Sequence, residues 1–142
     1  MRELEEQRNG RNKNTIIDYK YISSNRFRKR FDHISNNKKL NKLLYKTAKK
    51  MLLHRSGTEY EDMYWIDLKK FKIVCKITDS KYKKKILYTS AIKKIIKNSE
   101  NLLTIHTHPD SFPPSIDDIN SNYDHNYEIG IIACHDGRVY MY

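Results

Sequence analysis

Residues 102–118 read LLTIHTHPDSFPPSIDD and determine the fold that we expect for this chain. The apolar run at 102–108 is typical of a buried strand, and it ends on two histidines one residue apart. All three prolines of the chain fall within 109–114. This segment must be a loop, because proline cannot donate the hydrogen bonds of regular pairing. The residues after it predict a helix over 116–126, so the stretch predicts a strand, a loop and a helix in succession.

The flanking sequence predicts further helices and strands. One upstream segment has apolar residues at three- and four-residue spacings, which is typical of an amphipathic helix, and several other runs are strand-like. The expected helices cover 41–53 and 90–98, and the expected strands cover 59–68, 71–78, 138–142 and a run that starts at 127 or 128 and ends at 134. The pair Asp136-Gly137 is a strong signal for a hairpin turn between the last two strands. Alternating strands and helices of this kind predict an α/β or α+β domain, with one mixed sheet flanked by helices.

Two segments of different composition suggest the domain organisation. Residues 1–36 are polar, basic and poor in periodic apolar residues, so we expect an N-terminal extension or an interdomain linker there. Residues 37–142 are expected to form the folded domain. The basic cluster at 26–31 includes Phe27 and Phe31 and could bind nucleic acid, although a flexible tail is the plainer interpretation.

The formal net charge of the chain is +11, and its sign changes along the sequence. Residues 1–105 carry 27 Lys/Arg and 11 Asp/Glu, whereas residues 106–142 carry one and six. An acidic segment favours a divalent cation, and the basic remainder could hold nucleic acid or another acidic partner. The plainer interpretation of the many lysines is a solvated surface.

The composition also bears on the compartment of the protein. The longest apolar runs are too short to span a bilayer, and residues 1–20 are too charged for a secretory signal. Cys75 and Cys134 lie in apolar runs, where two buried thiols are preferred and a disulfide is the alternative. Free thiols suit a reducing environment, so we expect a cytoplasmic protein without a membrane partner.

Two histidines and a later aspartate carry the chemistry that we expect. His106 and His108 are one residue apart in the expected strand, so their side chains point to the same face. Two histidines and one carboxylate are the three ligands of a catalytic zinc site, whose fourth position stays open for water. Asp118 is the expected carboxylate. Ser115 and Asp118 also fit a capping box at the start of the next helix, which is the structural alternative.

The pattern His-x-His-Pro, five residues, then Ser-x-x-Asp resembles the motif of the JAMM (JAB1/MPN+) zinc metallopeptidases. The loop is one residue shorter than in the eukaryotic deubiquitinases of that family, and its Pro-Pro-Ser ending is similar to bacterial and phage-type JAB domains. The resemblance covers about residues 40–142 and implies an MPN/JAB-like fold. It further implies that His106, His108 and Asp118 bind Zn²⁺, and that Ser115 hydrogen-bonds near the attacking water and the oxyanion.

The same resemblance implies an upstream glutamate that acts as general acid and base. Glu59 and Glu61 open the strand expected after the first helix, and side-chain alternation would place both on one face of it. The Gly-x-Glu order that ends at Glu59 matches some relatives, so Glu59 is preferred and Glu61 is the alternative. Asp117 is the neighbour most easily confused with Asp118, but only Asp118 keeps the Ser-x-x-Asp spacing.

We therefore expect a zinc-dependent metallopeptidase or isopeptidase that hydrolyses a peptide or isopeptide bond in a protein or peptide substrate. No Gly-x-Ser-x-Gly elbow surrounds Ser115, so a serine nucleophile is not expected. The alternative is a basic module, associated with nucleic acid or a capsid, whose metal is structural and supports no catalysis. Such a closed site would need a fourth protein ligand, for example His125 or Asp110.

Overall fold

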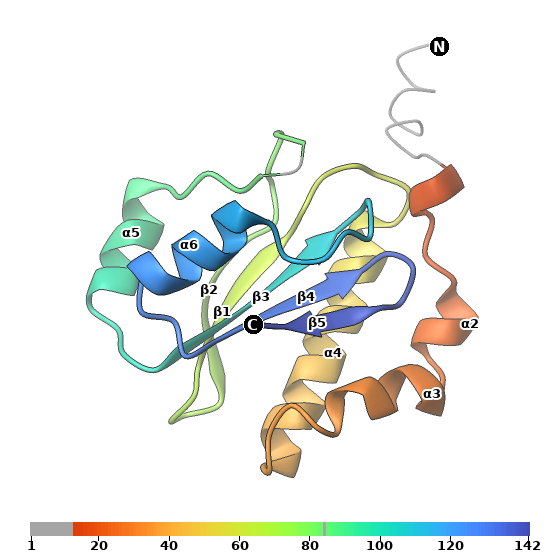
Figure 1. Ribbon diagram of the computed structural model, residues 1–142, viewed down its shortest axis with the longest axis horizontal. Coiled ribbons are helices and arrows are strands. Elements are labelled where there is room, and N and C mark those ends of the chain that lie inside the picture. The colour runs from red at the N-terminus through yellow and green to blue at the C-terminus, as the bar shows by residue number, and fades with distance from the viewer. Residues whose placement is uncertain (1–12, 84) are drawn as a thin grey trace.

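Five strands form one mixed sheet, and the computed structural model describes it together with its helices over residues 13–83 and 85–142 (Figure 1). The strands are β1 (Met63–Asp67), β2 (Lys72–Ile77), β3 (Leu102–His108), β4 (Ile129–Cys134) and β5 (Val139–Met141). The helices are η1 (Lys13–Thr15), α2 (Tyr19–Ile22), α3 (Asn25–Arg28), η2 (Lys29–Phe31), α4 (Lys38–Arg55), α5 (Ser90–Lys97) and α6 (Ile116–Asp124). This architecture confirms the expected mixed sheet flanked by helices. Among the described helices, none combines the length and the apolar character that crossing a membrane would require.

The central strand of the sheet is β3. The strand order is β2-β1-β3-β4-β5, in which β3 pairs antiparallel with β1 and parallel with β4. A parallel pair needs a crossover connection, and α6 provides it between β3 and β4. The outer pairs, β1–β2 and β4–β5, are antiparallel hairpins. Gly137 has a φ of 92° in the second hairpin, so the turn predicted at 136–137 is confirmed.

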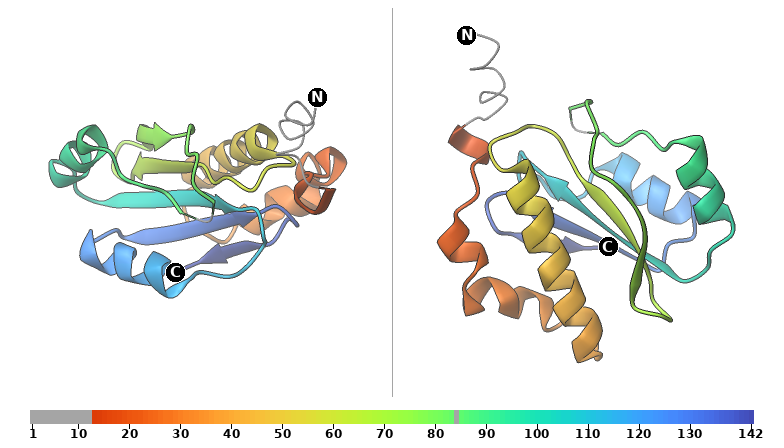
Figure 2. Two further views of the ribbon diagram at one scale, coloured as in Figure 1. Left: turned by 90° about the horizontal axis from the view of Figure 1, so that it is seen from above. Right: turned by 180° about the vertical axis from the view of Figure 1, so that it is seen from behind.

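Alternation along β3 sends its side chains to opposite faces of the sheet. Leu103 and Ile105 pack against α4 in the larger core cluster. The even-numbered residues, which include His106 and His108, point to the other face, where Trp65 lies in a smaller cluster with residues of α5. Figure 2, seen from behind, shows α4 in front of the strands and α6 beyond them. All of β3 is buried, so one strand supplies both the core and the histidine pair.

Residues 14–36, which the sequence predicts to be an extension or linker, pack onto α4 instead. Phe27 and Phe31 are fully buried and belong to the same core cluster as the leucines of α4. The helices that carry them are only three or four residues long, so the sequence shows no helical period there. Residues 1–12 of the predicted extension lie outside the described residues.

The predicted helices and strands occur, and their ends differ most from the prediction at the starts of α4 and β1. Helix α4 starts before residue 41 because the side chain of Asn37 accepts hydrogen bonds from the amides of Lys39 and Leu40. Strand β1 begins at Met63 and not at residue 59. This second shift decides which glutamate faces the histidines.

The two cysteines are free thiols on separate strands, Cys75 on β2 and Cys134 on β4. Strands β1 and β3 lie between them in the sheet. At about 4.8 Å per strand spacing, the two residues are at least about 14 Å apart, which is beyond the reach of a disulfide. The sheet therefore keeps the thiols apart.

Truncation of Phe27 tests whether α3 belongs to the core. We expect Phe27→Ala to lower the free energy of unfolding by about 3–5 kcal/mol, because it removes a buried ring and leaves a cavity. Arg26→Ala changes the exposed neighbour and should alter the free energy by less than about 0.5 kcal/mol. Urea unfolding followed by circular dichroism measures both. Equally small effects would show that α3 is a detachable extension.

Candidate metal centre

Three side chains from β3 and α6 direct their polar atoms to one point. The Nε2 atoms of His106 and His108 lie 3.0 Å apart. Asp118 reaches both of them, with Oδ1 3.3 Å from His106 Nε2 and Oδ2 3.2 Å from His108 Nε2. In a tetrahedral zinc site with bonds near 2.0–2.1 Å, two ligand atoms are about 3.3 Å apart. These three residues are called the donor triad below. The separations of their donor atoms are close to that value, with a different oxygen of Asp118 facing each histidine.

The capping box at the start of α6 places Asp118. The Ser115 hydroxyl accepts a hydrogen bond from the Asp118 amide at 3.0 Å, and Asp118 Oδ2 accepts one from the Ser115 amide at 2.9 Å. The same carboxylate contacts both histidines, so capping and metal binding are compatible roles. The capping box predicted from the sequence is thus confirmed, and it fixes the carboxylate that faces the histidines.

A hydrogen bond on the side of the His108 ring away from the triad determines which of its two ring nitrogens is unprotonated in the neutral ring. His108 Nδ1 lies 2.7 Å from the carbonyl oxygen of Phe112. A carbonyl only accepts, so Nδ1 carries the proton and Nε2 is the unprotonated nitrogen of the neutral ring. A carbonyl in this position is a common outer partner of a ligating histidine. The loop is held in turn by the amides of Ser111 and His135, which donate to the His108 carbonyl at 3.0 and 3.2 Å.

The charges within the triad shift the pKa values of its members. Burial lowers the pKa of His108, but its hydrogen bonds to Asp118 and Phe112 and the nearby Glu61 carboxylate outweigh burial and raise it above 6.5. Burial raises the pKa of Asp118, but its hydrogen bonds with His106 and His108 hold it well below its usual range. The cluster thus favours positive charge at its centre, where a proton or a metal ion can lie.

Glu61 faces the triad from the start of β1. One of its carboxylate oxygens and a ring nitrogen from each of His106 and His108 lie within 4.8 Å of one another. Glu61 is 6% exposed, and no hydrogen bond or ion pair engages its carboxylate among the described residues. Burial raises its pKa, and the histidine rings oppose this rise only in part. A buried carboxylate with a raised pKa is suited to accept and return a proton.

Glu59, the base preferred from the sequence, lies away from the triad. Its Oε2 is 3.0 Å from Lys83 Nζ, and its side chain is 44% exposed. The alternation of side chains along β1 does not extend from Glu61 back to Glu59, because the pairing with β3 reaches only to Asp62. The Asp62 amide donates to the Thr107 hydroxyl, and the Asp62 carbonyl accepts from the Thr107 amide. The structure therefore brings Glu61 to the histidines and leaves Glu59 outside.

Two hollows flank the donor triad, and Ser115 lines both. The hollow beside the proline loop has a volume of 390 Å³, and Phe112 forms part of its wall. The other, of 250 Å³, is lined on one side by tyrosines: Tyr88, Tyr127 and Tyr142. A side chain at Gly130 would collide with the ring of Tyr142, so glycine makes room for it. Tyr142 was not among the residues singled out from the sequence, because only the long-range pairing with Gly130 brings it here.

The other candidate residues are engaged elsewhere. His54 Nδ1 pairs with Asp62 at 2.7 Å on the opposite face of the sheet. His125 Nδ1 is 2.8 Å from the carbonyl oxygen of Ser121 at the exposed end of α6. Asp117 is exposed, whereas Asp118 is partly buried against the histidines. Among the described residues, the group whose donor atoms all lie within 4.8 Å is His106, His108 and Glu61. Asp118, the carboxylate expected from the sequence, contacts both histidines beside this group, and its role as a metal ligand stays a prediction.

Metal binding by variants tests the donor triad. We expect about one Zn²⁺ per wild-type chain, and at least about 100-fold weaker binding for His106→Ala, His108→Ala and Asp118→Asn, because each removes one donor. His125→Ala makes the same substitution outside the triad and should bind as the wild type does. Isothermal titration calorimetry measures the affinities. Unchanged affinity in all three triad variants would contradict the site.

The raised pKa of His108 predicts how metal affinity depends on pH. A proton on His108 must leave before the nitrogen can bind a cation, whereas Asp118 stays ionised because its pKa is lowered. Zinc affinity should therefore decrease as the pH falls through a value above 6.5, and binding should release protons. Calorimetry in buffers of different ionisation enthalpy counts the protons. An affinity that stays constant between about pH 8 and pH 6 would contradict this.

Comparison with known proteins yields no match to this chain: no protein-family model, no curated protein and no solved structure corresponds to it. The resemblance to the JAMM metallopeptidases therefore rests on the motif from His106 to Asp118. The donor triad, the buried Glu61 and the flanking hollows are the observations from which a function has to be argued.

Proposed function

We propose that this chain is a JAMM-type, zinc-dependent metallopeptidase or isopeptidase with an MPN/JAB-like fold. The observation that carries the proposal is the buried carboxylate of Glu61, which faces the donor triad without a partner of its own among the described residues. In a structural metal site such a group would have a role only as a further ligand. A hydrolytic site needs it, because an attacking water must lose a proton and a leaving amine must gain one.

The residues present fit Zn²⁺ in number, type and spacing. His106, His108 and Asp118 would hold the ion, and the three distances between their donor atoms are 3.0, 3.2 and 3.3 Å. A zinc ion with three protein ligands lowers the pKa of a water molecule to about 7 and polarises the carbonyl under attack. The cytoplasmic location expected from the free thiols stays part of the proposal.

Glu61 is the proposed general base and acid. Its raised pKa means that it can take the proton of the attacking water and keep it until the amine leaves. The Ser115 hydroxyl accepts from the Asp118 amide and still has its own proton to donate. That proton can stabilise the negative oxygen that develops on the substrate carbonyl. Glu61 and Ser115 both line the two hollows. A substrate chain that lies across the hollows would therefore pass between the Glu61 carboxylate and the Ser115 hydroxyl.

The alternative function, a basic module with a structural metal, requires a closed coordination shell. His125 donates to a backbone carbonyl or accepts from Ser121 on the exposed end of α6, and Asp110 accepts a hydrogen bond from the Phe112 amide. Neither forms a group with the histidines in the described residues. Glu61 could close the shell only by becoming a ligand, in which case its removal would weaken metal binding.

Exchange of each glutamate for glutamine tests this proposal. We expect Glu61→Gln to bind zinc as the wild type does and to lose about 10²–10⁴-fold in peptide hydrolysis, because only the proton acceptor is lost. Glu59→Gln makes the same change two residues away, at an exposed carboxylate paired with Lys83, and should retain activity. Mass spectrometry of the new termini that zinc-loaded protein generates in a digested proteome measures hydrolysis across peptides of many sequences.

Two results would contradict the proposed role of Glu61. If Glu59→Gln abolished hydrolysis and Glu61→Gln did not, the base would be the residue preferred from the sequence. If Glu61→Gln weakened zinc binding by 10-fold or more, about the effect of losing a metal partner, the structural-metal alternative would be favoured.

A further inference from the structure

The segment that carries α2, α3 and α4 is almost purely basic. Residues 19–58 contain twelve Lys/Arg and one acidic residue, Asp32. Surfaces that are merely soluble usually mix both signs, whereas single-sign surfaces attract charged partners. Arg55 is the one of these cations that is buried in an ion pair, with Asp62 at 2.6 Å. The remaining cations form no ion pair among the described residues.

A groove runs between α3 and α4 in this segment, with a volume of 640 Å³. One wall is a stripe of lysines that recur every four residues along α4, namely Lys38, Lys42 and Lys46. Arg28 of α3 provides the cation of the other wall. Asp32, also at the groove, carries too little charge to balance these four cations. Figure 1 shows α3 and α4 side by side at the end of the molecule away from α6.

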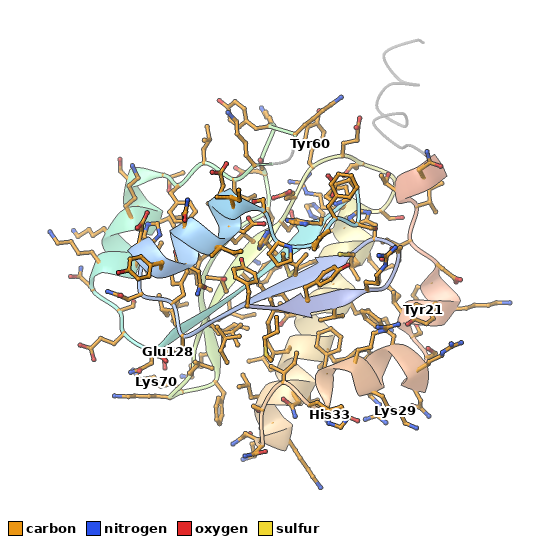
Figure 3. The ribbon with its side chains drawn as sticks, viewed as in Figure 1. Tyr21, Lys29, His33, Tyr60, Lys70 and Glu128 are labelled. Atoms are coloured by element: carbon orange, nitrogen blue, oxygen red, sulfur yellow. The ribbon has the colours of Figure 1, made fainter. Side chains whose placement is uncertain are left out.

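The walls of the groove are fixed by buried contacts. The side-chain amide of Asn41 donates to the carbonyls of Asp32 and Ser35, at 3.2 and 2.9 Å, which ties the end of η2 to α4. Below the groove, the rings of Phe27 and Phe31 pack against Tyr45, with centroids 6.0 and 6.1 Å apart. Buried contacts therefore hold in place the backbone that carries these cations. Figure 3 shows Lys29 and His33, from the same segment, on its outer side.

We propose that this groove binds the phosphate backbone of nucleic acid without sequence selectivity. Phe27 and Phe31, the aromatic residues of the basic cluster, are buried and cannot stack on bases. Recognition is therefore left to cations that neutralise phosphates. No aliphatic side chain lines the groove. The groove could therefore attract an anionic bilayer by charge, but it offers no aliphatic side chain to insert into the bilayer.

The proposed nucleic-acid groove is independent of the metal centre. Helix α4 packs on the face of the sheet opposite to His106 and His108, so a bound duplex would leave the donor triad accessible. Four acidic residues, Glu61, Asp110, Asp117 and Asp118, line the hollows at the triad. A phosphate backbone is attracted by the groove and repelled by the acidic hollows, which favours one orientation of the protein on its ligand.

Salt-dependent binding to a short, fluorescently labelled DNA duplex tests the groove, with the full chain and fluorescence anisotropy. The slope of log K against log salt decreases by about 0.9 for each phosphate contact that is lost. We expect Lys38→Gln/Lys42→Gln/Lys46→Gln to reduce the slope by about 2–3 and the affinity by tenfold or more at about 100 mM salt. Glutamine has nearly the helix propensity of lysine, so α4 should persist, which circular dichroism checks.

A matched control removes three lysines from another helix. Lys93→Gln/Lys94→Gln/Lys97→Gln changes the net charge equally at exposed positions of α5, and should leave the slope nearly unchanged. Equal loss in both triple variants would overturn the proposal, because binding would then follow net charge alone. Tighter binding to phosphatidylserine vesicles than to the duplex at the same salt would also overturn it.

Discussion

The pairing of β3 with β1 and β4 is the constraint on which the rest of the structure depends. Because side chains alternate, one fully buried strand contributes Leu103 and Ile105 to the core under α4 and presents His106 and His108 on the other face. A register shift of one residue would exchange the two sets, placing the histidines under α4 and Leu103 and Ile105 on the face of the hollows. The hydrophobic effect that fixes the register of β3 therefore also fixes the histidine pair.

Strand β1 places the glutamate through a second, polar constraint. Asp62 is fully buried on the α4 side and pairs with Arg55 at 2.6 Å and with His54 at 2.7 Å. Arg55 also donates to the carbonyl of Thr78 at 2.8 Å. A buried carboxylate without such partners is costly, so β1 is held where Asp62 reaches them. Glu61 precedes Asp62 by one residue and must point to the opposite face, toward the histidines.

The sequence predicted correctly those features that depend on interactions between residues close together in the chain. The glycine turn at 136–137 and the capping box of Ser115 and Asp118 each depend on residues within a few positions, and both occur. The base is different, because the choice between Glu59 and Glu61 depends on where pairing with β3 begins. Long-range hydrogen bonds between Asp62 and Thr107 decide that, and no local pattern contains them. The short helices around Phe27 were missed for a related reason, since only contact with α4 shows that they belong to the core.

The dual role of Asp118 explains how an exposed helix start can carry a metal ligand. A carboxylate directed at two histidines would ordinarily lose side-chain entropy when it is fixed there. Here Oδ2 already accepts the Ser115 amide, and the Ser115 hydroxyl accepts the Asp118 amide, so the cap restricts the side chain before any cation binds. The carbonyl of Phe112 does the same for His108 by fixing its tautomer. The order within the donor triad therefore comes from backbone hydrogen bonds, and a metal ion would meet ligands that are already in place.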